Sequence, residues 1–222
     1  ISGKLFDGGI YKSTDAGLSW TMLNLPDPQV AAWSDFWKIV AWDSKNIYTL
    51  GQKDEDPVPT KALGLVKSTD GGETWQKISP PNIFFSSFDV APKDRNLIYG
   101  VSYYILYQEE AKSPSTVFCS RDGGTTWQPV KDYKMYGPVR ISPHDSNVIF
   151  LAHRDGLYKS TDGLMTVKKV LETEDISDIE FSFSDPNVVY AAGKGLRIFQ
   201  STDGGNTFTL KADLRKFITE HK

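Results

Sequence analysis

Acidic side chains in two long loops could catalyse the cleavage of a glycosidic bond. Asp54, Glu55 and Asp56 are consecutive in one loop, and Glu109 and Glu110 are neighbours in another. Glycoside hydrolysis needs two carboxyl groups roughly 5–10 Å apart, one donating a proton and the other acting as base or nucleophile. Consecutive acids are also typical of a solvated surface. We therefore keep Asp54, Glu109 and Glu110 as candidates and assign no catalytic residue.

A second polar group comes from three strands of similar sequence, aligned on the asparagine turn that follows each. The alignment places Asp89, Arg140 and Glu180 at one level. Arginine can grip a carboxylate or phosphate through two parallel hydrogen bonds, so this level could form a ligand site. The alternative is an ion-pair network that only joins strands. Neighbouring short loops would extend such a site with further polar side chains: His153, Arg154 and Lys194.

Aromatic side chains gather in the long loops as well. The loops 24–37, 51–62 and 102–116 are candidates for function because long loops on a rigid scaffold often carry it. Their aromatic and acidic composition suits a carbohydrate or a protein ligand, although the same rings could simply pack the loops onto the strands. The predicted ligand-binding aromatics are Trp33, Trp37, Tyr103, Tyr104 and Tyr107.

Other chemistries lack the residues that they need. The chain has three histidines, one cysteine and no Gly-x-Ser-x-Gly, His-Glu-x-x-His or Walker sequence. Cys119 is expected to be a small buried residue, and we predict no metal site and no cofactor. The net charge of −3 argues against a nucleic-acid partner, and no apolar run is long enough to predict insertion into a membrane.

An internal repeat defines the elements that must position these residues. The pattern Ser-x-Asp-x-Gly-x-Thr-Trp occurs five times with variations, as STDAGLSW, STDGGETW, SRDGGTTW, STDGLMTV and STDGGNTF. An aspartate side chain can accept hydrogen bonds from N–H groups just beyond it, and glycine provides positive φ, so each copy predicts a tight turn between two strands. The final aromatic residue is expected to plug the core. The repeated aspartates are Asp15, Asp70, Asp122, Asp162 and Asp203.

This octapeptide is the Asp-box, and the chain resembles Asp-box (bacterial neuraminidase repeat) β-propellers. That family includes sialidases, xyloglucan-degrading hydrolases, sortilin-like receptors and photosystem II assembly factors. The resemblance implies an all-β propeller with four-stranded antiparallel blades, in which the Asp-boxes are structural and chemistry lies on the opposite face. An extracytoplasmic location, whether periplasmic, secreted or at the cell surface, is likewise implied by the resemblance alone.

The repeats predict about five blades in one domain, residues 1–222. Four units contain strand A, an Asn turn, strand B, a loop, strand C, the Asp-box and strand D. An incomplete first blade would have strands in 1–6, 8–13 and 19–23, and residues 216–221 would add its fourth strand and close the ring. A segment of a longer propeller is the alternative. Strand direction places the B–C and D–A loops on the face opposite the boxes.

Three functions remain open from the sequence. The favoured one is a non-enzymatic binding or assembly scaffold that holds a protein or glycan ligand on its aromatic and acidic loops. A glycoside hydrolase or carbohydrate-binding propeller is the first alternative, and a structural segment of a larger secreted or surface protein is the second. Sialidase activity is disfavoured, because the family's Phe/Tyr-Arg-Ile-Pro motif has no match: VRIS and LRIF lack the proline.

Overall fold

The computed structural model describes most of the chain in two compact units, one up to Phe85 and one from Ser86 onward. Among the described residues, no helix is both long and apolar enough to cross a membrane. The described residues are 9–23, 34–53, 64–81, 83–102, 115–130, 133, 135 and 137–215, with the backbone alone for 34–37, 52 and 53.

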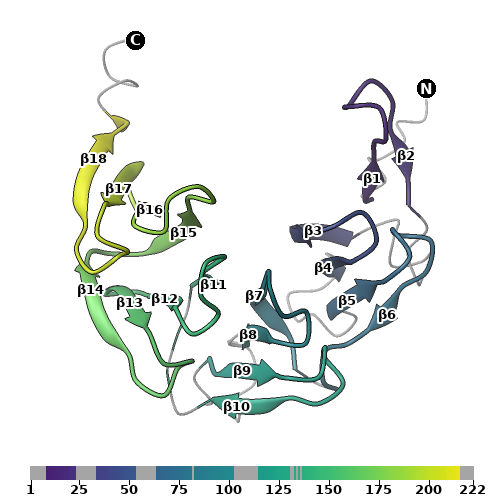
Figure 1. Ribbon diagram of the computed structural model, residues 1–222, viewed down its shortest axis with the longest axis horizontal. Helices are drawn as coiled ribbons and strands as arrows, with labels where there is room; N and C mark the ends of the chain where they lie inside the picture. Colours follow the sequence, from purple (N-terminus) through teal and green to yellow (C-terminus); the bar gives the residue numbers. More distant parts are fainter. Residues whose placement is uncertain are drawn as a thin grey trace. The chain divides into compact units, whose positions relative to one another are not determined.

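The first unit contains two antiparallel sheets (Figure 1). Blade 1 is the pair β1 (Tyr11–Lys12) and β2 (Thr21–Met22). Blade 2 has four strands: β3 (Ser34–Ala41), β4 (Ile47–Lys53), β5 (Gly64–Ser68) and β6 (Gln76–Lys77). The two strands of blade 1 lie within the predicted segments 8–13 and 19–23, whereas the strands predicted at 1–6 and 216–221 lie outside the described residues.

The second unit contains three four-stranded sheets in which consecutive strands pair antiparallel. Blade 3 runs through β7 (Phe85–Val90), β8 (Ile98–Ser102), β9 (Val117–Ser120) and β10 (Gln128–Val130). Blade 4 runs through β11 (Val139–Ile141), β12 (Ile149–His153), β13 (Gly156–Ser160) and β14 (Lys168–Glu172). Blade 5 runs through β15 (Ile176–Phe181), β16 (Val189–Gly193), β17 (Arg197–Ser201) and β18 (Thr209–Asp213). These sheets confirm the predicted all-β fold of four-stranded antiparallel blades.

Each Asp-box is a small cage of hydrogen bonds between the third and fourth strands of its blade. In blade 4 the Ser160 hydroxyl donates to Asp162 Oδ1 at 2.8 Å and accepts the Leu164 N–H at 2.9 Å. Asp162 Oδ1 accepts the Thr166 N–H at 2.9 Å, and Oδ2 accepts the Thr166 hydroxyl at 2.6 Å. All five boxes repeat this pattern. The predicted role of the aspartate in the turn is confirmed.

The box aromatics are less buried than the sequence predicts. Trp20 is 62% exposed, and Trp75, Trp127 and Phe208 are only partly buried. Each tryptophan turns its indole N–H back to a carbonyl of its own box, at 3.1 Å in all three cases. The expectation of a core plug is wrong for Trp20, whereas Trp75 and Phe208 are partly buried and pack against the core clusters of their blades.

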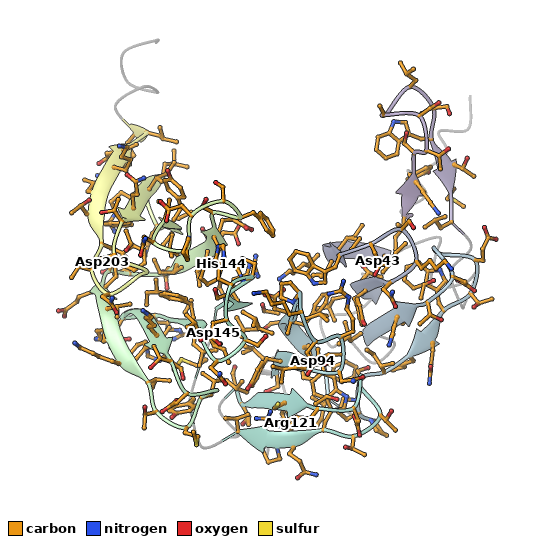
Figure 2. All side chains as sticks on the ribbon, in the orientation of Figure 1. Asp43, Asp94, Arg121, His144, Asp145 and Asp203 are labelled. Carbon is orange, nitrogen blue, oxygen red and sulfur yellow. The ribbon has the colours of Figure 1, made fainter. Side chains whose placement is uncertain are left out.

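The A–B turns contact the boxes directly. In blade 4 Asp145 Oδ1 accepts the Asn147 N–H at 2.9 Å, and the Asn147 carbonyl accepts the Gly163 N–H of the box at 3.1 Å. Blades 3 and 5 repeat the bond from the box glycine to the turn asparagine, and in blade 2 the acceptor is the Lys45 carbonyl. Figure 2 labels three of the turn aspartates, Asp43, Asp94 and Asp145. The predicted placement of A–B turns and boxes on one face is confirmed within these blades.

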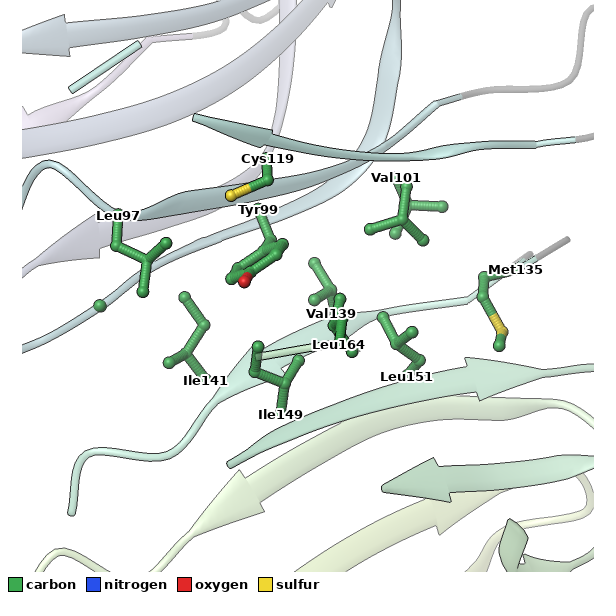
Figure 3. Close-up of a cluster of buried hydrophobic side chains, with 12 residues drawn as sticks. Leu97, Tyr99, Val101, Cys119, Met135, Val139, Ile141, Ile149, Leu151 and Leu164 are labelled. Carbon is green, nitrogen blue, oxygen red and sulfur yellow. The ribbon is translucent and has the colours of Figure 1, made fainter. Parts of the chain in front are cut away.

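The hydrophobic core of the second unit lies between its blades. Tyr99 and Val101 of blade 3 pack against Ile149 and Leu151 of blade 4, and Cys119 joins the same cluster (Figure 3). The next cluster centres on Phe150, which is fully buried between blades 4 and 5. Burial of such side chains contributes about 1.5–3 kcal/mol each, so packing between blades contributes much of the stability of this unit.

The packing of Phe150 gives a stability prediction for two adjacent glycines of the last box. Gly205→Ala would push a Cβ into the Phe150 ring and also force alanine to φ +82°. Gly204→Ala is the matched control, because φ is +73° there but the nearest atom, the Pro186 carbonyl oxygen, is 3.8 Å away. We expect losses of about 2–4 kcal/mol and about 1 kcal/mol respectively in urea unfolding. Equal losses would contradict the packing of this turn on blade 4.

Candidate functional site

Asp89 joins two blades of the second unit. It lies on β7 and is 4% exposed. Its Oδ2 accepts the backbone N–H of Ile141, on β11 of the neighbouring blade, at 2.8 Å. A buried carboxylate needs such donors, because burial without hydrogen bonds costs several kcal/mol. The carboxylate therefore contributes to the contact between blades 3 and 4.

Arg140, one residue before Ile141, makes the corresponding contacts between blades 4 and 5. Its Nε donates to the Ile179 carbonyl at 3.0 Å and its Nη1 to the Val139 carbonyl at 3.1 Å. Its Nη2 lies 2.5 Å from Asp178 Oδ1 but 3.9 Å from Glu180 Oε1. The arginine side chain is only 14% exposed. Its guanidinium therefore bonds mainly to groups of the protein itself, as expected if Arg140 belongs to an ion-pair network.

Asp178 is the partner that the sequence alignment did not identify. The asparagine turns align Arg140 with Glu180, whereas the shorter contact forms with Asp178, two residues earlier on β15. Alternate residues of a strand lie on one face, so both carboxylates can reach the arginine. The Glu180 side chain is 66% exposed and stays available to solvent. Strand periodicity could therefore have indicated Asp178 as a second candidate.

A second polar cluster forms at the turn between β12 and β13. Asp155 pairs with His153 Nδ1 and lies 2.5 Å from Lys169 Nζ on β14. The Tyr158 hydroxyl donates to the same carboxylate at 3.1 Å. These three hydrogen bonds, above all the one from Lys169, hold the pKa of Asp155 well below its usual range. His153 was predicted as a site residue, but Asp155, Tyr158 and Lys169 were not.

Lys194, on the B–C turn of blade 5, forms ion pairs with two acidic residues of the connection between β14 and β15. Lys194 Nζ lies 3.4 Å from Glu174 and 3.5 Å from Asp175, and all three side chains are more than half exposed. The Asp175 N–H donates to the Arg154 carbonyl at 3.3 Å, and the Asp175 carbonyl accepts the Lys194 N–H at 3.0 Å, so Asp175 connects the B–C turns of blades 4 and 5. Arg154 and Lys194 thus lie on neighbouring turns, as predicted.

The loop residues predicted to bind ligand fall mostly outside the described part. This applies to the aromatics Trp33, Tyr103, Tyr104 and Tyr107 and to the acids Asp54, Glu109 and Glu110. The sequence placed Trp37 in a loop, whereas the structure includes it in β3, at a register shift between Phe36 and Lys38.

The described titratable groups include no metal-binding cluster. No three His, Cys, Asp or Glu residues in the described ranges are close enough to hold an ion. Cys119 is buried, and burial raises the pKa of its thiol, which disfavours the reactive thiolate. Burial also raises the pKa of the adjacent Tyr99. Both groups therefore stay neutral near pH 7.

The contacts of Arg140 predict a structural cost when the side chain is removed. Arg140→Ala would leave the Asp178 carboxylate and the Ile179 carbonyl without this donor, so we expect a loss of about 2–3 kcal/mol in denaturant unfolding. Asp178→Asn is the control and should cost about 0.5–1 kcal/mol, because this carboxylate is 49% exposed. Unchanged stability of Arg140→Ala would show that the arginine is not a structural link.

Comparison with known proteins agrees with the repeat and the blades. The model of the BNR/Asp-box repeat family matches residues 66–77 and 118–129, the second and third boxes. No curated protein matches the chain in sequence. Both matched segments run from strand C through the box into strand D, where the cage of hydrogen bonds was found.

Solved structures of similar fold are distant in sequence. The GH74 enzyme of Niastella koreensis is 18% identical with a TM-score of 0.61, over 82% of this chain and 30% of that one. An ancestral GH74 enzyme is 20% identical with a TM-score of 0.64, over 93% and 28%. YCF48 from Cyanidioschyzon merolae is 15% identical with a TM-score of 0.59, over 92% and 66%. The chain thus spans less than a third of either GH74 enzyme. It is a β-propeller built from BNR/Asp-box repeats.

Proposed function

We propose that this propeller is a non-enzymatic binding or assembly scaffold whose ligand contacts the face opposite the Asp-boxes. The proposal rests on the hydrogen bonds made by two polar residues on the first strands of blades 3 and 4. Asp89 and Arg140 direct their hydrogen bonds to neighbouring blades of the second unit, so they rigidify the scaffold. A rigid scaffold positions loops for binding, since it lowers the entropy lost when a complex forms.

The charged turns of blades 4 and 5 support a binding role for this face. Asp155 is fixed by Lys169, Tyr158 and His153, while Lys194 and its carboxylate partners are more exposed. Mixed charges held in place by hydrogen bonds favour a partner with a complementary polar surface, as a protein or a glycan has. The predicted aromatics Trp33, Trp37, Tyr103, Tyr104 and Tyr107 would add apolar contact area, since Tyr and Trp are common anchors in interfaces.

A glycoside hydrolase is the alternative, because two of the structural neighbours are GH74 enzymes. This chain would then use a pair among Asp54, Glu109 and Glu110 at its long loops. All three neighbours share the fold at 20% identity or less, so these similarities do not by themselves favour a hydrolase over a scaffold. A structural segment of a larger secreted or surface protein is the third option. The extracytoplasmic location remains part of this proposal.

The test compares partner capture by matched variants. The chain is immobilised and exposed to extract of its source organism, and bound proteins and glycans are quantified by mass spectrometry. We expect Tyr104→Ala and the double variant Arg154→Glu, Lys194→Glu to lose a specific partner by at least about tenfold, because each alters the proposed face. Lys211→Glu, an exposed change on β18, is the control and should bind as the unaltered protein does.

Hydrolysis is measured on the same preparations with a panel of polysaccharides and fluorogenic glycosides. Melting temperatures of all variants must agree to within about 2 °C for a loss of capture to report on binding. Sugar release that disappears in Glu109→Gln or Asp54→Asn would overturn the scaffold and support the hydrolase. Equal capture by every variant would exclude this face as the binding surface.

A further inference from the structure

Four of the five Asp–Gly pairs among the described residues lie at the same place inside an Asp-box. They are 70–71, 122–123, 162–163 and 203–204, and the fifth pair, outside the boxes, is 155–156. In all four boxes the glycine of the pair has a positive φ, between +70° and +79°. Glycine reaches this region without the clash that a Cβ atom causes, so the shape of the turn favours glycine directly after the aspartate.

An Asp–Gly pair is open to a rearrangement of its own backbone. The glycine nitrogen attacks Cγ of the aspartate, a C–N bond forms, and the carboxyl OH leaves with the amide proton as water. Water then opens the resulting succinimide ring at either of its two carbonyl groups. One opening restores aspartate, and the other gives isoaspartate, in which the main chain runs through the side-chain CH₂ group and is one carbon longer. The rearrangement needs a neutral carboxyl group, an accessible glycine nitrogen and contact between the two.

The cage of each box holds the carboxyl group. In blade 4 the Asp162 carboxylate accepts the Thr166 N–H at 2.9 Å, the Thr166 hydroxyl at 2.6 Å and the Ser160 hydroxyl at 2.8 Å. These donors favour the charged form and lower the pKa of Asp162 to about 2, with the largest effect from the Thr166 hydroxyl. At pH 5 the neutral form of Asp162 is therefore about sixtyfold rarer than in an unfolded chain, where the pKa is 3.8.

The A–B turn of each blade holds the glycine nitrogen. The Gly163 N–H donates to the Asn147 carbonyl at 3.1 Å, and the boxes of blades 2, 3 and 5 repeat this bond at 2.9, 3.0 and 2.8 Å. The Gly163 carbonyl also accepts the Tyr99 hydroxyl of the preceding blade at 3.2 Å. Lys159 Nζ bonds in the same way to the Gly204 carbonyl at 2.8 Å. A glycine held on both sides cannot turn its nitrogen toward Cγ of the aspartate unless these bonds break.

We propose that the Asp–Gly pairs of the boxes are latent sites of isoaspartate formation, each protected by its own cage and by the A–B turn of its blade. A box that loses its cage rearranges at its own aspartate, whereas the other boxes stay intact. The extra carbon lengthens a turn whose ends are fixed by two paired strands, so the original cage does not form again after the rearrangement. The protein therefore acquires this modification one box at a time.

The first box provides an internal comparison. Asp15 has the same cage, but Ala16 follows it at φ +57°, so this box contains no Asp–Gly pair. The methyl group of the alanine crowds the nitrogen that would attack Cγ. In an unfolded chain Asp15 is therefore expected to rearrange more slowly than the four Asp–Gly pairs of the other boxes. This difference comes from the residue after the aspartate and is independent of the cage.

Removing one donor of a single cage tests the proposal. Thr166→Val deletes the hydroxyl bond to Asp162 and keeps the shape of the side chain, and Thr161→Val is the matched control, because this exposed threonine makes none of the cage bonds. The folded proteins are incubated at pH 5, and isoaspartate in each box is quantified by mass spectrometry with electron-transfer fragmentation, which distinguishes it from aspartate. We expect Thr166→Val to raise the rate at Asp162 at least about fivefold over the control and to leave the rate at Asp203 unchanged.

The chain unfolded in guanidinium gives the reference rates. There the four Asp–Gly pairs of the boxes should rearrange at least about tenfold faster than in the folded protein, and Asp15 more slowly than these four. Equal rates in the folded and the unfolded chain, or no acceleration at Asp162 in the variant, would overturn the proposal. Equal acceleration at Asp162 and Asp203 would assign the protection to global folding and would overturn the role of the single cage. Ser160→Ala, which removes the other hydroxyl of the cage, is the alternative if Thr166→Val does not fold.

Discussion

The cage of hydrogen bonds between the box serine and the box aspartate is the interaction on which the other contacts of each blade depend. It closes the turn between strands C and D without help from neighbouring blades, since Ser160, Asp162 and Thr166 satisfy one another locally. The cage fixes the adjacent glycine, whose N–H binds the A–B turn of the same blade. The carbonyl of that glycine then accepts the donor from the preceding blade. One short motif thereby links local structure to packing between blades.

This arrangement explains how repeats of low similarity can stack in the same way. The acceptor is a backbone carbonyl, which every residue has, so only the donor must be specified by sequence. Lysine in blade 4 and tyrosine in blade 3 both meet this need. Blade 3 has Cys119 where blade 4 has Lys159, and the hydroxyl of Tyr99, paired with Cys119 across the strands, donates to the box carbonyl in its place.

Much of the fold could be predicted because the Asp-box is a local motif with a fixed pattern of donors and acceptors. The strands before each box and the Asn turns followed from alternation and spacing. The exposure of Trp20 could not be predicted from its box, since Trp75 and Trp127 make the same indole hydrogen bond and are partly buried. The pairing of Arg140 with Asp178 depends on reach across two blades, which an alignment of turns does not contain. The candidate site was predicted only in part. Asp155 was not predicted, because its partner Lys169 lies on another strand, fourteen residues away in sequence.

Titration of the box aspartates tests the cage most directly. Hydrogen bonds from Thr166 and Ser160 lower the pKa of Asp162 to about 2, and Asp15 and Asp122 are lowered likewise. A lowered pKa in the folded state stabilises the fold above the unfolded pKa near 3.8, and this contribution is lost as the pH falls towards about 2. Carboxyl ¹³C NMR, with Asp162→Asn to assign the resonance, should give a midpoint of about 2 for Asp162. A midpoint near 3.8 would show that the hydrogen bonds of the cage do not form in solution and would contradict their role in holding the turn between strands C and D.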